Sequence, residues 1–217
     1  INLSELLIEN FLDDLEAKIN LNKVYISKKA FVTSNPETIY LTVVDRDLNA
    51  VSFINSICHS FGSGITTSNS GILFQNRGVN FRLEKDHPNA IQGGKRPLHT
   101  IIPGLATNKN NETILSYGVM GGQYQPIGQT HVLQNIIDYN LEIQEAINFP
   151  RAFALDSFLK IEKSLDKKIV NELNNIGHNI QLVPEAIGGG QCIKIDRKEG
   201  VMIGGSDPRK DGMAIGY

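Results

Sequence analysis

Apolar residues recur at helical spacing over the first part of the chain. Leu3, Leu6, Phe11, Leu15 and Ile19 share one face of this pattern. We therefore expect a helix here, followed by extended chain up to about residue 30. The next residues are polar and rich in turn formers, which predicts an exposed loop before the first strand.

At residue 38 the pattern changes from helical to extended. β-branched and aromatic residues over 38–44 and 50–54 predict two strands, and the polar stretch between them predicts a hairpin turn. A further short strand is expected at 71–75. Polar residues with Gly and Pro fill 76–103, which predicts a long ordered loop that carries function.

The second half of the chain alternates between the two patterns. Strands are expected at 114–118, 191–195 and 201–203, and helices at 130–139, 142–147 and 170–176. The strands come in hairpins and the helices in a consecutive block. This order favours an α+β fold over a doubly wound parallel sheet.

Composition excludes several classes of protein. Of the 217 residues 41% are hydrophobic and the net charge is −2, which argues against a nucleic-acid surface or a polybasic membrane face. No apolar run approaches the ~18 residues of a membrane span. Cys58 and Cys192 are too few for a disulfide framework or a four-ligand zinc site. The chain opens at Ile1, as expected of a piece of a longer polypeptide, so its start says nothing about a targeting peptide.

Most of the candidate chemistry has a simpler structural interpretation. The glycine-rich runs lack the lysine and the spacing of a phosphate loop, and the histidines show no metal-ligand spacing. Cys58 and His59 are neighbours that would point to opposite faces of a strand, so they do not form a nucleophile–base dyad. Residues 206–209 are interpreted as a turn in preference to a catalytic Ser–Asp pair. Thr38 lies where a polar loop meets a strand, which alone is common for threonine.

A series of short motifs runs in order through residues 38–217. It consists of TIYLTVVD at 38–45, NAVS at 49–52, FGSG at 61–64, GILFQN at 71–76, GKRPL at 94–98, GG at 121–122, AINFPR at 146–151, GH at 177–178, SDPR at 206–209 and GY at 216–217. On these motifs the segment resembles the small subunit of the gamma-glutamyltransferase family, whose members are N-terminal-nucleophile hydrolases. Each motif alone is weak, whereas the ordered set is specific.

The resemblance implies a self-processing enzyme. The family precursor cuts itself immediately before a threonine, so Thr38 is the implied nucleophile and Glu37–Thr38 the implied cleavage site. The freed α-amine can take the proton of the threonine hydroxyl, whereas in an uncut chain that nitrogen is an amide. Residues 1–37 then correspond to the C-terminal end of the large subunit with its processing loop. Residues 38–217 correspond to the small, catalytic subunit.

The resemblance also assigns residues around this nucleophile. Gly121 and Gly122 take the place of a glycine pair whose backbone N–H groups stabilise the oxyanion. Ser56 falls where the family has a second hydroxyl bonded to the nucleophile. These roles, together with that of Thr38, make up the implied catalytic machinery.

The implied substrate-binding residues depart from the family's pattern. Cys58 replaces an asparagine that contacts the glutamyl α-substituents, and Arg77 replaces a glutamine. Asn80 replaces the aspartate that pairs with the α-ammonium group, while His99 and Thr100 replace a serine pair that holds the α-carboxylate. These changes favour an acyl group that lacks the α-amine, for example a glutaryl group.

The fold implied by the resemblance is a four-layer αββα sandwich of two stacked antiparallel sheets, of which this chain supplies part. The expected partner is the large subunit, or the N-terminal part of the same precursor. No cofactor, metal, nucleic acid or membrane is implied. The oligomeric state and the compartment stay open, with a prokaryotic cytoplasm or periplasm as the two options for the compartment.

The implied reaction is cleavage of γ-glutamyl or related acyl amides, such as glutathione, through a threonine acyl-enzyme that passes the acyl group to water or an amine. Two alternatives stay open. One is a glutaryl or cephalosporin-type acylase. The other is an uncleaved, inactive homologue with a binding role.

Overall fold

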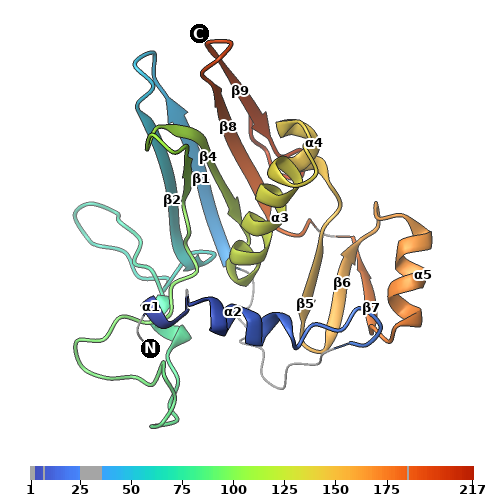
Figure 1. Cartoon of the computed structure of the whole chain (residues 1–217). Coiled ribbons are helices and arrows are strands. Elements are labelled where there is room, and N and C mark those ends of the chain that lie inside the picture. The colour runs from blue at the N-terminus through green and yellow to red at the C-terminus, as the bar shows by residue number, and fades with distance from the viewer. Residues whose placement is uncertain (1–2, 7, 25–35, 185) are drawn as a thin grey trace. The chain divides into compact units, whose positions relative to one another are not determined.

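The structure of the chain is a computed structural model that describes residues 3–6, 8–24, 36–184 and 186–217 (Figure 1). The chain divides into two compact units, each formed by two stretches of the sequence. One unit combines Ile1–Ala30 with Ala152–Pro184, and the other combines Phe31–Arg151 with Glu185–Tyr217. Most of the predicted loop before residue 38 lies outside the described residues.

The larger unit is built on a four-stranded antiparallel sheet. Its strands, in spatial order, are β3 (Gly104–Thr107), β4 (Thr113–Met120), β8 (Gly189–Asp196) and β9 (Val201–Ser206). A separate antiparallel hairpin consists of β1 (Pro36–Val44) and β2 (Ala50–His59). This hairpin packs against β4 and β8, so that two sheets are stacked on each other.

Polar and aromatic side chains join the two stacked sheets. Tyr40 of β1 is buried, and its hydroxyl lies 2.7 Å from Ser52 Oγ of β2. Gly118 of β4 lets the Tyr40 ring lie against the sheet, because a Cβ at this position would come within 2.4 Å of the ring. Thr42 Oγ1 reaches Ser116 Oγ of β4 at 2.5 Å. The inner face of the hairpin is therefore fixed on the larger sheet by packing and by hydrogen bonds.

Helices cover the opposite face of the four-stranded sheet. Successive residues of β4 show this, since Gly118 faces Tyr40 of the hairpin and Val119 faces Gly128 of α3 (Gln125–Ile137). The second helix, α4 (Ile143–Asn148), begins with a capping box and packs on β8 and β9 (Figure 1). The unit thus has three layers, namely helices, a four-stranded sheet and a two-stranded sheet.

The smaller unit contains the remaining elements. They are α1 (Leu3–Leu6), α2 (Glu9–Glu16), β5 (Ala152–Leu155), β6 (Phe158–Glu162), α5 (Lys167–Asn175) and β7 (Ile180–Val183). Strands β5 and β6 form a hairpin, and β7 pairs with β6 in parallel after the crossover through α5. The side chain of Asp166 caps α5 by accepting a hydrogen bond from the backbone N–H of Lys168 at 2.6 Å.

Several predicted element boundaries need correction. The strand expected at 71–75 is reduced to an isolated bridge between Thr66 and Leu73. Helix α3 begins five residues before the predicted start at residue 130, and the single predicted N-terminal helix is divided into α1 and α2. The short strands β3, β5, β6 and β7 have no counterpart in the prediction. The combination of helices with hairpin-built antiparallel sheets agrees with the predicted α+β class.

Candidate active site

Thr38 lies in an irregular part of the β1–β2 ladder. Glu37 pairs with Cys58 and Ile39 pairs with Asn55, so the register shifts at the residue between them. Two residues of β2, Ser56 and Ile57, therefore lie opposite Thr38, as in a β-bulge. Because β1 begins at Pro36, the predicted cleavage site is inside a paired strand. The side chain of Thr38 is half-buried.

Ser56 and Cys58 stand at the end of β2 beside this bulge. The hydroxyl of Ser56 accepts a hydrogen bond from the backbone N–H of Cys58 at 3.0 Å. Cys58 is buried and has a φ of 78°, an uncommon value for a residue other than glycine. The backbone of β2 is therefore irregular at Cys58, beside the bulge opposite Thr38, although the strand stays paired with β1 up to His59.

The predicted loop at 76–103 folds back to the same strand end. It contains one turn of 3₁₀ helix, η1 (Arg77–Asn80), which contacts β2. The guanidinium of Arg77 is 3% exposed and its Nη2 donates to the backbone carbonyl of Ser56 at 3.5 Å. Asn80 is 9% exposed, and its Nδ2 donates to the carbonyl of Leu98 at 3.0 Å. Two predicted binding residues thus share one turn of helix, and one of them, Arg77, contacts Ser56.

His99 and Thr100 follow Leu98 directly in this loop. The side chain of His99 is exposed, and its Nδ1 lies 2.7 Å from the carbonyl oxygen of Pro97, to which it donates. Thr100 is half-buried. The bond from Asn80 to Leu98 brings this segment close to η1, while the imidazole itself is bonded locally.

The predicted oxyanion residues Gly121 and Gly122 end β4 and lead into η2 (Gly122–Tyr124). Their φ angles are 128° and 58°, both in the region that favours glycine. A Cβ on Gly121 would come within 2.9 Å of the Cα of Gly188. Strand β1 contacts η2, so the glycine turn and the strand of Thr38 are neighbours in the fold. Turns of this kind present backbone N–H groups to anions.

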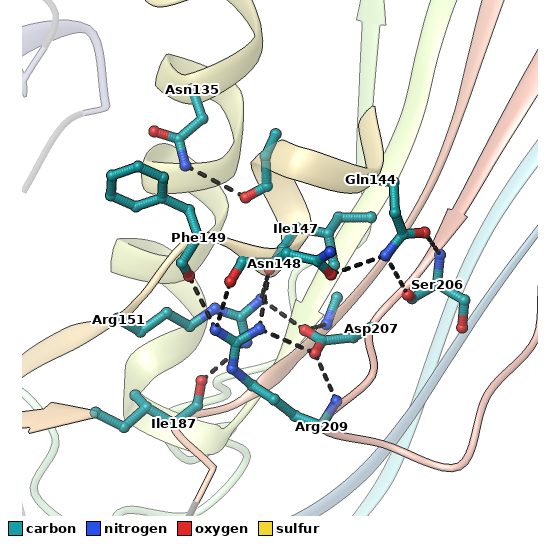
Figure 2. A network of polar contacts seen from close by, with 12 residues as sticks. Asn135, Gln144, Ile147, Asn148, Phe149, Arg151, Ile187, Ser206, Asp207 and Arg209 are labelled. Carbon is teal, nitrogen blue, oxygen red and sulfur yellow. Dashed lines mark hydrogen bonds and ion pairs between the residues drawn. The ribbon is translucent and has the colours of Figure 1, made fainter. Parts of the chain in front are cut away.

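A buried ion-pair network lies beneath the glycine turn, and sequence reasoning found in its residues only a turn at 206–209 and the family motifs AINFPR and SDPR. Figure 2 shows Asp207 joined to both Arg151 and Arg209. Asp207 Oδ2 accepts from Arg151 Nη2 at 2.6 Å and from the backbone N–H of Gly190 at 2.8 Å. Arg151 Nη1 donates to the carbonyl of Ile187 at 2.9 Å. The network therefore fixes residues 187–190, the segment that contacts Gly121.

Arg209 completes this network from the other side. Its Nη1 lies 3.2 Å from Asp207 Oδ1, and its remaining donors bond the carbonyls of Ile147, Asn148 and Phe149 at the end of α4 (Figure 2). The available sequence signal was the motif SDPR at 206–209. Residues 207–210 do form the expected turn, since Lys210 N–H donates to the Asp207 carbonyl at 3.1 Å. The motif thus forms a turn and also bonds that turn to the end of α4.

Other features lie apart from this site. A cavity of about 800 Å³ is lined by parts of β1, β8, β9 and the final residues of the chain, and Thr38 is not among its lining residues. Over the described ranges, no three His, Cys, Asp or Glu side chains gather in a group that would hold a metal ion. In the same part of the chain, no helix has the length and apolar character to cross a membrane.

Comparison with solved structures identifies the fold. A cephalosporin acylase from Bacillus halodurans is 37% identical, with a TM-score of 0.90 over 100% of this chain and 40% of its own. A gamma-glutamyltranspeptidase from Pseudomonas nitroreducens has a TM-score of 0.74 over 82% of this chain. The stacked sheets and helices are thus those of an N-terminal-nucleophile hydrolase.

Sequence comparison narrows this class to a family. The family model described as Gamma-glutamyltranspeptidase matches residues 1–217. The chain therefore belongs to the gamma-glutamyltranspeptidase family, which confirms the resemblance. It is similar to the glutathione hydrolase-like YwrD proenzyme of Bacillus subtilis, with 38% identity over 83% of this chain and 36% of the relative. The oxamate amidohydrolase proenzyme of Klebsiella pneumoniae is 36% identical over the same shares. The chain thus spans about a third of these curated relatives.

Proposed function

We propose that this chain is the catalytic part of a self-processing amidohydrolase or acyltransferase in which Thr38 is the nucleophile. The observation that carries the proposal is the bulge in the β1–β2 ladder, which puts Ser56 opposite Thr38. The glycine turn at Gly121 and Gly122 adjoins the same strand through η2. Relatives named glutathione hydrolase and acylase, all proenzymes, support this reaction class.

The proposed reaction begins with processing. Hydrolysis of the Glu37–Thr38 bond consumes one water and leaves a carboxylate on Glu37 and an amine on Thr38. The amine then takes the proton from the Thr38 hydroxyl as its oxygen attacks the acyl carbon of the substrate. Backbone N–H groups of Gly121 and Gly122 stabilise the oxyanion, each donor being worth about 3–4 kcal/mol.

The second half of the reaction restores the enzyme. The tetrahedral intermediate collapses, the leaving amine takes the proton held by the Thr38 amine, and the acyl group stays on Thr38 Oγ as an ester. Water or a second amine attacks this ester and releases the acid or the transferred amide. Candidate substrates are γ-glutamyl amides such as glutathione. A glutaryl-type acylase is the second candidate, favoured by Arg77, which contacts Ser56, and by Asn80 on the same turn of helix.

We further propose that the preceding part of the precursor is the partner of this chain. Residues 1–37 would be the end of the large subunit and 38–217 the small subunit. The outer face of the hairpin supports this assignment, because Ile39, Leu41, Val43, Val51 and Phe53 are all exposed on it. A contiguous apolar face of this kind indicates a covering partner. Strands and helices of the large subunit on this face would complete the four-layer αββα sandwich.

The test is the intact mass and N-terminal sequence of the full-length precursor after purification. The expected result is a fragment that begins at Thr38. The matched variants are Thr38→Ala, which should stay uncut and inactive, and Thr38→Ser, which keeps a hydroxyl and should still cut. A wild-type chain that stays in one piece and binds its ligands without turnover would replace the proposal with the binding-protein hypothesis.

A further inference from the structure

Two buried arginines of the larger unit differ in their bonding partners. Arg151 is 1% exposed and has a carboxylate at 2.6 Å with two backbone carbonyls. Arg77 is 3% exposed, and the bond recorded for its guanidinium is the 3.5 Å contact to the Ser56 carbonyl. Among the described residues no acidic side chain forms an ion pair with Arg77. A buried guanidinium without a counter-charge is costly, and a bound anion would relieve that cost.

Asn80, on the same turn of helix, supplies a second unsatisfied group. Its Nδ2 donates to the Leu98 carbonyl at 3.0 Å, which fixes the orientation of the amide. Its Oδ1 is buried and has no partner within the described residues. Buried acceptors are almost always satisfied in native proteins, so an orphaned one points to a missing ligand. The ligand must present an N–H or O–H to Asn80.

Arg77 lies beside the strand position opposite the proposed nucleophile, and Asn80 ends the same turn of 3₁₀ helix. The guanidinium of Arg77 touches the carbonyl of Ser56, and the ladder register puts Ser56 opposite Thr38. An acyl group attacked by Thr38 therefore extends past Arg77 and Asn80. The charge on this side of the site is positive, and Asn80 is neutral.

On the basis of the proposed function, we propose that the acyl donor carries a free carboxylate and no ammonium group, with Arg77 binding the carboxylate. Asn80 Oδ1 accepts a hydrogen bond from a neutral N–H or O–H. A planar guanidinium suits a carboxylate because it binds both oxygens. A free ammonium would face Arg77 without any compensating charge from Asn80. The substrate class is therefore mono-amides of short dicarboxylic acids.

Three p-nitroanilides test this assignment on the processed full-length enzyme. The γ-glutamyl and glutaryl anilides differ only in the ammonium group, and the valeryl anilide carries a methyl in place of the carboxylate. We expect kcat/KM for the glutaryl anilide to exceed that for the γ-glutamyl anilide by at least about tenfold. It should exceed that for the valeryl anilide by about a hundredfold, as a charge-assisted pair predicts.

Variants assign the preference to the two side chains. Arg77→Gln should bring the glutaryl-to-valeryl ratio of kcat/KM down to about one. Asn80→Asp should raise the γ-glutamyl-to-glutaryl ratio at least about tenfold, since it returns a counter-charge for ammonium. Arg46→Gln, at an exposed arginine in the hairpin turn, removes the same charge and should leave both ratios unchanged. Release of the fragment that begins at Thr38 shows that each variant has folded.

The outcomes separate this inference from the proposed function. A wild-type enzyme that prefers the γ-glutamyl anilide overturns the carboxylate-only assignment and leaves the nucleophile proposal in place. A glutaryl preference that persists in Arg77→Gln overturns the role of Arg77 alone. A processed enzyme that cleaves none of the anilides overturns both proposals.

Discussion

At the scale of single residues, the glycine turn at Gly121 packs closely against a segment that is distant in sequence, at Gly188. Gly121 has a φ of 128° and its Cα hydrogen faces the Cα of Gly188. Gly188 in turn lies against the carbonyl of Met120 and the ring of Tyr124. Neither segment can move without the other, and this interlock holds the proposed oxyanion donors in place.

Gly121→Ala should therefore lower the free energy of unfolding by about 2–4 kcal/mol, through backbone strain and overlap together. Gly200→Ala is the matched control, because its φ is 68° and a Cβ there meets nothing within 4 Å. That variant should lose only about 1 kcal/mol. Urea unfolding of both variants measures the difference. Equal losses would mean that the contact with Gly188 carries no energy.

Cys192 is a thiol that the fold keeps protonated. Burial raises its pKa from 9.0 to about 12. In the folded protein at pH 8 we expect iodoacetamide to alkylate Cys192 at least about a hundredfold more slowly than in the urea-unfolded chain. Peptide mapping separates this reaction from that of Cys58. Equal rates in the two states would show that Cys192 is accessible.

The same shift makes stability depend on pH. Because the folded pKa lies above the unfolded value, the contribution of this thiol is complete below about pH 9 and is lost as the pH rises toward 12. A Cys192→Ala variant should remove the thiol's share of the alkaline slope in the free energy of unfolding, whereas Tyr40 and Tyr117, whose pKa values burial also raises, keep theirs. The measurement is urea unfolding at neutral and alkaline pH.

At this scale the sequence predicted which residues belong to the site but not which hydrogen bonds their side chains form. The family resemblance pointed to Arg77 and Asn80, and the structure places both on one turn of helix with Arg77 in contact with Ser56. The unpaired Oδ1 of Asn80 could not be predicted from the sequence, because the orientation of the amide depends on which backbone carbonyl accepts from Nδ2. The local bond that occupies the imidazole of His99 likewise depends on the path of the loop.

At the scale of elements, the ion-pair network joins α4 to β8 and the turn after β9. Asp207 is almost fully buried between two arginines, so removing its charge leaves both without compensation. Asp207→Asn should lower the free energy of unfolding by about 3–5 kcal/mol. Glu199→Gln is the control, since its pairing with Lys198 is exposed and should give no measurable change. A small loss in Asp207→Asn would mean that packing alone holds the turn.

Helix α3 shows why the start of an element could not be predicted from sequence, since it begins five residues before the expected helix. Gln125, Gln129 and Asn135 are buried on it, which breaks the apolar period that marks a buried face. They are buried because they bond the backbone, as when Gln125 Oε1 accepts from the Ile102 N–H at 3.1 Å. The hairpin β1–β2 was predictable because its β-branched and aromatic residues form two extended runs separated by a short polar turn.

At the scale of the whole molecule, one face of the hairpin packs against the four-stranded sheet, and its other face is apolar and exposed. Leu41 is 44% exposed on the outer face, with Ile39 and Val43 on either side. The four-layer architecture could not be derived from this chain alone, because under the proposed assignment the elements that cover this face would come from the large subunit. The exposed apolar side chains of the hairpin are the surface that those elements would cover.

In the full-length precursor, Leu41→Lys should lower the free energy of unfolding by about 2–3 kcal/mol, because the side chain would be buried at the subunit contact. Leu21→Lys is the control, at a leucine that is 84% exposed in the smaller unit. It should change little. Urea unfolding of both precursors decides, and equal small effects would mean that the outer face of the hairpin stays open to solvent.

The position of the predicted cleavage site inside a paired strand has one more consequence. The bulge at Thr38 exists only when β2 has found its register with β1, and β2 in turn supports η1. Under the proposed processing, a chain that has mispaired this hairpin cannot cut itself. Cleavage therefore activates only molecules in which the hairpin is correctly paired. Release of the fragment that begins at Thr38 then reports correct folding, without the need for a separate protease.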